Sequence, residues 1–281
     1  MEIEKEQHII KLSENNCSIS LDISYQCNNN PKPVVVYTHG FKGFKDWGHF
    51  PLIADFFAKR NYVFVKINFS MNGTSPDRLC DFVDLEAFGK NTISQELHDI
   101  DQVINYIKGL ANPEFNTSRM ALLGHSRGGA TCHIKALENE SIKSVASWAS
   151  VIALRERYAS TDLELWKKDG VKYVFNGRTN QSMPLYYSLA EDIINHSTRF
   201  DLRKRLSETT KPTLLLHCEK DTVVEPQELD LVSNDNPLII KHVVKDGDHT
   251  FGGKHPYSEQ QLPKASLEAC EHTHKFFQQY L

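Results

Sequence analysis

Apolar residues recur along the chain with two different periods, and these periods predict the order of strands and helices. Residues 8–12 (HIIKL) and 17–25 (CSISLDISY) alternate apolar and polar side chains, as half-buried strands do, and the turn-forming SENN separates them. Further strands are predicted at 34–40, 62–70, 119–126, 144–150, 212–221 and 239–249. Helices are predicted at 50–61, 91–110, 127–139 and 265–281.

From Val34 onward the predicted strands and helices alternate, which is typical of β-α-β units with a parallel sheet covered by helices on both faces. The run VVVY suits a central strand, because it is apolar at every position. The two leading strands suggest an antiparallel edge. We therefore expect an α/β fold.

Residues 151–208 show no clear period and are longer than a simple connection between a helix and a strand requires. A segment of this size cannot easily bury a core of its own. The sequence thus favours a single domain over residues 1–281, with a lid-like insertion at about 151–208.

Composition excludes several classes of protein. The 281 residues are 40% apolar and 24% charged, which is ordinary for a globular protein. The 32 basic and 36 acidic residues are well mixed and give a net charge of −4, so no basic stripe indicates nucleic-acid binding. No window approaches the roughly 18 apolar residues that cross a bilayer.

The first residues, MEIEKEQHIIKLSENN, are charged and do not resemble a secretory signal, so we expect a cytoplasmic protein. Its 6 cysteines are widely spaced without a C-x-x-C pair, which favours reduced thiols. No zinc-type spacing, H-E-x-x-H or P-loop occurs, and His272 and His274 fall on different helix faces. We expect no cofactor and no metal.

The stretch ALLGHSRGGA at 121–130 places Ser126 between a predicted strand and a predicted helix, in the pattern G-x-S-x-G. A sharp turn there exposes the serine oxygen, and Gly124 and Gly128 relieve the crowding that the turn causes. The helix N-terminus favours negative charge near the serine. Ser126 is thus a candidate nucleophile; the alternative is a serine that only caps the helix.

Acyl transfer needs two N–H donors for the oxyanion. His39 and Gly40 directly follow the first central strand, and Gly40 lets the backbone approach the reacting group. The candidate donors are the amides of Phe41 and Arg127. The alternative for His39–Gly40 is a turn that merely ends a strand. His125, beside the serine, is expected to pack or to orient the turn.

A base and an acid are expected on loops after later strands. His249 follows the last predicted strand, and Asp221 ends the strand before it. The order Ser126, Asp221, His249 is the order of the α/β-hydrolase triad. Glu219, Asp246 and Asp248 compete with Asp221 for the acid, and His249 could be an ordinary loop histidine.

These four motifs in order resemble the α/β-hydrolase superfamily over about residues 32–281. THGFKGFKDW and HCEKDTVVEP are similar to the prolyl-oligopeptidase-related and the cinnamoyl-esterase or dienelactone-hydrolase-like branches. The resemblance implies an eight-stranded sheet, a triad of Ser126, His249 and Asp221, and oxyanion donors at Phe41 and Arg127.

The leading hypothesis is a serine carboxylesterase that cleaves a small to medium ester, aryl esters included, through an acyl-enzyme. A peptidase or amidase on the same triad and a non-catalytic binding protein of the same fold remain alternatives. Within 151–208, Trp166, Tyr186 and Tyr187 either line the substrate pocket or pack the insertion on the core. Neither the substrate's acyl and alcohol groups nor the oligomeric state follows from the sequence.

Overall fold

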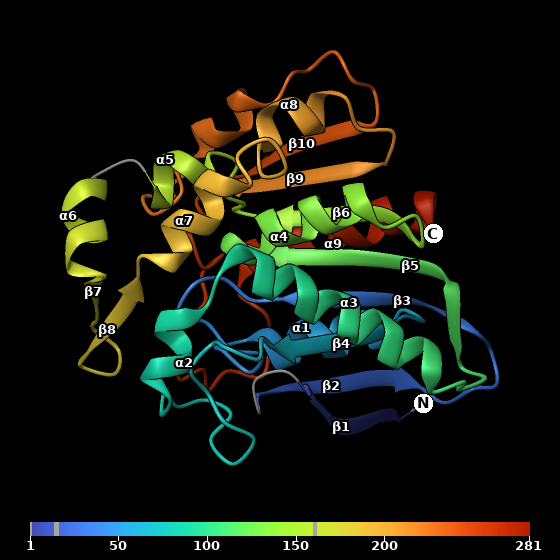
Figure 1. Ribbon diagram of the computed structural model, residues 1–281. Helices are drawn as coiled ribbons and strands as arrows, with labels where there is room; N and C mark the ends of the chain where they lie inside the picture. Colours follow the sequence, from blue (N-terminus) through green and yellow to red (C-terminus); the bar gives the residue numbers. More distant parts are fainter. Residues whose placement is uncertain (1, 14–16, 160–161) are drawn as a thin grey trace.

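The computed structural model describes residues 2–13, 17–159 and 162–281. An eight-stranded sheet runs through the molecule in the order β1-β2-β4-β3-β5-β6-β9-β10 (Figure 1). Its strands are β1 (Ile3–Lys11), β2 (Ser18–Gln26), β3 (Lys32–Thr38), β4 (Val63–Asn68), β5 (Phe115–His125), β6 (Ile142–Trp148), β9 (Thr213–Cys218) and β10 (Ile239–Val244).

The first two strands form an antiparallel edge, and the remaining strands are parallel to one another. β1 pairs antiparallel with β2 and β2 with β4, whereas β4, β3, β5, β6, β9 and β10 pair in parallel. Every residue of β4 and β9 is buried. The VVVY run lies in β3, between β4 and β5 inside the sheet, as its apolar character predicted. The expected mostly parallel eight-stranded sheet with its antiparallel edge is confirmed.

Four helices cover the two faces of the sheet. Val35 and Tyr37 share one apolar cluster with residues of α1 (Phe50–Ala58) and α9 (Lys264–Tyr280). Val34 and Val36 face the other way and pack with α3 (Ile93–Gly109) and α4 (Arg127–Glu138), which lie in front of the sheet in Figure 1. Successive side chains of β3 therefore point to opposite faces of the sheet and pack against the helices on each face.

Residues 151–208 contain more regular structure than their sequence indicates. They form α5 (Leu154–Tyr158), α6 (Leu163–Asp169), the antiparallel pair β7 (Val171–Asn176) and β8 (Gln181–Tyr186), α7 (Ser188–Asn195) and α8 (Leu202–Ser207). Two further short elements, α2 (Leu85–Lys90) and the 3₁₀ helix η1 (Pro226–Leu231), were also not predicted. Buried side chains such as Met183 and Leu189 join the same apolar cluster as Leu97 of α3, so this region packs on the main body.

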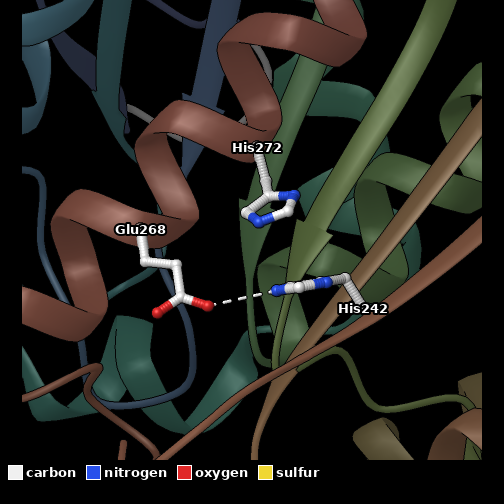
Figure 2. Close-up of side chains that lie close together, drawn as sticks. All are labelled: His242, Glu268 and His272. Atoms are coloured by element: carbon white, nitrogen blue, oxygen red, sulfur yellow. Dashed lines mark hydrogen bonds and ion pairs between the residues drawn. The ribbon is translucent and has the colours of Figure 1, made fainter.

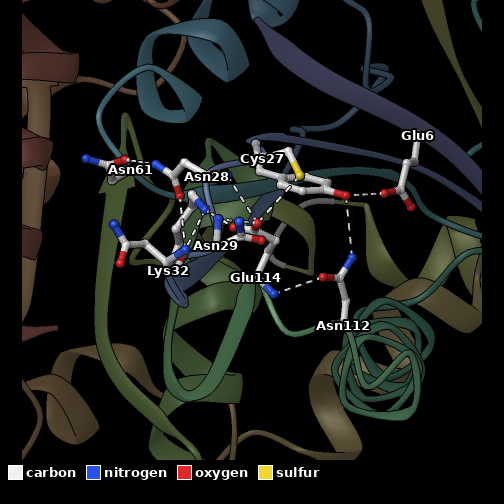
Figure 3. A network of polar contacts seen from close by, with 10 residues as sticks. Glu6, Cys27, Asn28, Asn29, Lys32, Asn61, Asn112 and Glu114 are labelled. Carbon is white, nitrogen blue, oxygen red and sulfur yellow. Dashed lines mark hydrogen bonds and ion pairs between the residues drawn. The ribbon is translucent and has the colours of Figure 1, made fainter. Parts of the chain in front are cut away.

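At the amino ends of β3 and β5 a polar network fastens the loop after β2 (Figure 3). Glu114 Oε1 accepts hydrogen bonds from the amides of Asn28 (3.1 Å) and Asn29 (2.7 Å). Its other oxygen forms a buried ion pair with Lys32, at the first residue of β3. The network therefore lies at the amino ends of the parallel strands, opposite their carboxyl ends.

Within the described ranges, no helix has the length and apolar character needed to span a membrane. All 6 cysteines are unpaired, as the sequence suggested, and Cys132, Cys218 and Cys270 are buried.

Four buried histidines and the partly buried His125 make the stability of this fold sensitive to acid. Burial lowers their pKa values from 6.5 to about 4 for His39, His49 and His217, and to about 3 for His125 and His133. The unfolded chain therefore binds more protons than the folded chain between pH 6.5 and about 3. The free energy of unfolding should fall as the pH decreases through this window and should be insensitive to these groups above it.

His217 tests this prediction, because neither of its ring nitrogens has a hydrogen-bond partner among the described residues. We expect His217→Leu to flatten the slope of unfolding free energy against pH by up to about 1.4 kcal/mol per pH unit. Urea unfolding at pH 5 and pH 7 measures it, with the half-exposed His242→Leu as a control. An equal slope in wild type and His217→Leu would contradict the prediction.

Candidate active site

Ser126 occupies a sharp turn between β5 and α4. Its backbone has φ 55° and ψ −122°, a conformation that residues other than glycine rarely adopt. Its amide donates to the carbonyl oxygen of Trp148 on β6 (2.8 Å). No hydrogen bond from its side chain caps α4, so the turn does not use the hydroxyl for capping.

The glycines around the serine are required by close backbone contacts. A Cβ at Gly124 would lie 2.3 Å from the carbonyl oxygen of Gly128, and a Cβ at Gly128 would lie 2.4 Å from that of His39. A Cβ at Gly40 would lie 2.8 Å from the Cβ of Ser126. The ends of β3 and β5 and the start of α4 therefore meet closely enough to exclude larger residues at these positions.

His249 and Asp221 are joined by a hydrogen bond. Asp221 lies just past β9 and is fully buried, and its Oδ2 is 2.8 Å from Nδ1 of His249. Its Oδ1 accepts from the amides of Val223 (2.8 Å) and Val224 (2.9 Å). Burial alone would raise the pKa of Asp221, but His249 and these two amides outweigh burial and hold it below its usual value. The carboxylate is thus ionised and oriented toward the imidazole.

The three competing acids are engaged elsewhere. Asp246 pairs with Lys220 (2.6 Å) at the surface, and Glu219 accepts from the Asp246 amide (3.4 Å). Asp248 Oδ1 accepts from the backbone amides of Thr250 and Gly252 and so holds the loop in place. Among the described residues, Asp221 is the carboxylate that contacts His249.

His125 and His39 support the loops on either side of the serine. Nε2 of His125 donates to the carbonyl oxygen of His249 (2.8 Å), and their rings lie 4.8 Å apart. Nδ1 of His39 donates to the carbonyl oxygen of Gly40 (2.9 Å). The orienting role predicted for His125 is consistent with this contact.

Phe41 and Arg127 lie on the two loops that approach Ser126. Phe41 follows Gly40, and Arg127 is the first residue of α4. In the part of the chain that the structure describes, neither amide N–H makes a hydrogen bond. Both are therefore free to donate to a ligand.

The side chain of Arg127 has a partner that sequence reasoning missed. Its guanidinium forms an ion pair with Glu96 of α3, and both side chains are less than 10% exposed. It also lies 4.9 Å from the ring centroid of Phe41. Burial raises the pKa of Glu96, an effect that Arg127 and Asn91 oppose. One buried side chain thus links α3, α4 and the loop after β3.

A pocket of about 250 Å³ opens at Ser126 and His249. Aromatic side chains of Phe41, Trp47 and Phe50 line it together with Lys42, Asn176 and Arg178. Of these six residues, Phe41 alone was singled out from the sequence; Lys42 and Trp47 lie in the same THGFKGFKDW motif, which could have indicated them. Asn176 and Arg178 show that residues 151–208 do reach this pocket.

The three aromatic residues predicted from that region are not among the residues that line the pocket. Trp166 is buried and donates to the carbonyl oxygen of Leu185 (2.8 Å). Tyr186 hydrogen-bonds Glu86 of α2, and Tyr187 packs against the apolar cluster. In the structure they pack the insertion, which was the open alternative.

One group of three side chains in the described ranges has ligand atoms near one another: His242 of β10 with Glu268 and His272 of α9 (Figure 2). Their ligand atoms lie within 4.8 Å, and His242 Nε2 is 3.2 Å from Glu268 Oε1. The two rings stack at 3.7 Å with an interplanar angle of 26°. Imidazole binds a metal in the plane of its ring, so these rings direct their nitrogens into separate planes. The group would have to rotate a ring before it could hold an ion.

Comparison with known families identifies the chain. The family BD-FAE matches residues 21–235. The chain belongs to the BD-FAE family. It has the α/β-hydrolase fold, as the motifs suggested. No curated protein matches it.

Solved structures share the fold of this BD-FAE member at low sequence identity. Est1E from Butyrivibrio proteoclasticus is 15% identical with a TM-score of 0.69, covering 97% of this chain and 98% of its own; it has also been solved with ferulic acid bound. DcsB, solved with a substrate analogue, is 15% identical with a TM-score of 0.71, covering 99% and 100%. Pyrococcus horikoshii acylaminoacyl peptidase is 14% identical with a TM-score of 0.67, covering 99% of this chain but 42% of its own.

The buried pair of Arg127 and Glu96 predicts a large effect of one substitution. Glu96→Gln leaves the guanidinium without a counter-ion in a desolvated site, so the free energy of unfolding should fall by about 3–5 kcal/mol. Urea unfolding measures the loss. The surface variant Arg203→Gln, which removes an exposed ion pair with Glu156, should change stability little. Equal effects of the two substitutions would refute the structural role of the buried pair.

Proposed function

We propose that this BD-FAE family member is a serine esterase that cleaves carboxylic esters through an acyl-enzyme on Ser126. The observation that carries the proposal is one pocket lined by both Ser126, on a strained turn, and His249, whose Nδ1 is 2.8 Å from buried Asp221. A serine, an imidazole and a carboxylate in this relation are the components of nucleophilic acyl transfer.

In the proposed reaction, Ser126 Oγ attacks the ester carbonyl while Nε2 of His249 takes its proton. Asp221 holds the neutral imidazole in the tautomer with its proton on Nδ1, so that Nε2 can accept the serine proton. Asp221 also stabilises the imidazolium that forms. The amides of Phe41 and Arg127 donate to the oxyanion. His249 then protonates the leaving alcohol, and a water molecule activated by the same imidazole releases the acid.

Three aromatic rings in the pocket, those of Phe41, Trp47 and Phe50, support an acyl or aryl group of modest size. Est1E, which shares the fold, binds ferulic acid, an aromatic acid, and this supports an aromatic substrate. We further propose that residues 1–281 act as one domain in which residues 151–208 form a lid, since Asn176 and Arg178 of that region line the pocket. The unpaired thiols suit the cytoplasm.

A peptidase or amidase on the same residues is the second candidate, favoured by the shared fold of the acylaminoacyl peptidase. Turnover of 4-nitrophenyl butyrate against that of an aminoacyl 4-nitroanilide separates the two. A faster rate on the anilide would reverse the ranking.

Labelling by a serine-directed fluorophosphonate tests the nucleophile. Wild-type protein should be labelled, and Ser126→Ala should lose both the label and ester turnover, because the hydroxyl is the attacking group. Ser150→Ala is a matched control, since Ser150 is a buried neighbour of the turn, and it should keep the label. Labelling that survives Ser126→Ala would disprove the assignment.

Asp221→Asn tests the role of the acid. The amide cannot hold the imidazole in the required tautomer, so kcat on 4-nitrophenyl butyrate at pH 7 should fall by about 10⁴. Asp246→Asn, which removes only a surface ion pair, should keep kcat within a factor of about two. A small loss in Asp221→Asn would assign the acid elsewhere.

A further inference from the structure

Two positive charges flank the pocket at Ser126. Lys42 lies on the loop after β3, and Arg178 lies on the turn between β7 and β8, yet both line the same pocket as Ser126 and His249. In residues 2–13, 17–159 and 162–281, neither side chain takes part in an ion pair. Two cations from distant parts of the chain thus meet at one pocket without a carboxylate partner.

Each cation is held by aromatic rings or by backbone rather than by an acid. The Arg178 guanidinium lies 4.9 Å from the ring centroid of Phe44 and 5.3 Å from that of Phe82. The Lys42 ammonium donates to the carbonyl oxygen of Phe175 (3.3 Å) and lies 5.7 Å from the ring of Phe41. These contacts hold the side chains in place and leave their charges unneutralised.

The two cations repel each other. Burial lowers the pKa of Lys42, and the charge of Arg178 lowers it further. Burial also lowers the pKa of Arg178, an effect that Cys80 and Asp81 oppose. Asp81 already pairs with Arg78 at the surface (3.5 Å). An anion bound between Lys42 and Arg178 would therefore relieve a repulsion that the protein itself leaves in place.

The backbone conformation of Lys42 also supports a ligand-binding site. Its φ of 58° is left-handed, a conformation that glycine adopts far more readily than lysine. Strained residues of this kind concentrate at ligand-binding sites. The strain places a lysine at the pocket where a glycine would fit the backbone better.

This inference rests on the proposed esterase function. We propose that Lys42 and Arg178 bind a carboxylate on the substrate, so that the enzyme prefers esters that carry a free carboxylate in addition to the ester group. A carboxylate is small enough for a pocket of about 250 Å³ that also holds the reacting ester. Guanidinium and ammonium donors form charge-assisted hydrogen bonds with it.

A matched pair of esters tests the preference: 4-nitrophenyl hemiglutarate, with a free carboxylate, and 4-nitrophenyl valerate, of equal chain length without it. Wild type should show the higher kcat/KM on the hemiglutarate, and added salt should reduce the difference. Lys42→Met and Arg178→Gln should each lower the ratio of hemiglutarate to valerate about ten-fold or more. The surface variant Lys143→Met should keep the wild-type ratio.

A ratio at or below one in wild type, or an unchanged ratio in the Lys42→Met, Arg178→Gln double variant, would overturn the subsite. Failure to cleave either ester would instead refute the esterase function. In that event calorimetric titration of Ser126→Ala with monoethyl glutarate decides the subsite separately. Binding that weakens when Arg178→Gln is added supports it, and equal or absent binding in both proteins overturns it.

Discussion

The site depends on how closely three pieces of backbone can approach one another. Gly128 lies against the carbonyl oxygens at the end of β3, Gly124 against the first turn of α4, and Gly40 against Ser126 itself. This contact forces Ser126 into a left-handed conformation and holds its side chain at the edge of a pocket. Such strain persists only where the surrounding packing over-determines it. Here the surroundings are the ends of two central strands and the start of a helix, where most residues are buried.

Buried polar contacts extend this constraint outward. The ion pair of Arg127 with Glu96 joins the start of α4 to α3, and the guanidinium also supports Phe41. His125 fastens the loop that carries His249, and His39 fastens Gly40. Each loop at this edge of the sheet is therefore tied to a neighbour by a buried side chain. A pocket built in this way is arranged before a ligand enters, which lowers the cost of orienting that ligand.

The long elements were predictable because their stability comes from patterns that the sequence shows directly. β4 and β9 are buried at every residue, and α3 and α9 each carry an apolar stripe over 17 residues. The short elements were not predictable. α2, with 6 residues, and the β7–β8 pair are too short to be stable alone, and they form because they pack on each other and on the body of the protein.

The same division holds for the site. Ser126, Asp221 and His249 each follow a strand of the parallel series, and carboxyl ends of parallel strands meet at one edge, so their order along the chain was enough to expect them together. Position at the end of a strand favoured Asp221 over Glu219, Asp246 and Asp248, but its contact with His249 depends on where the loop turns its side chain. Nor could the sequence say that Trp166 faces the interior of the insertion while Arg178 reaches the pocket. The order of the strands along the chain and the residues of each turn can be read from the sequence itself. The direction of a loop side chain depends instead on contacts between residues far apart in sequence.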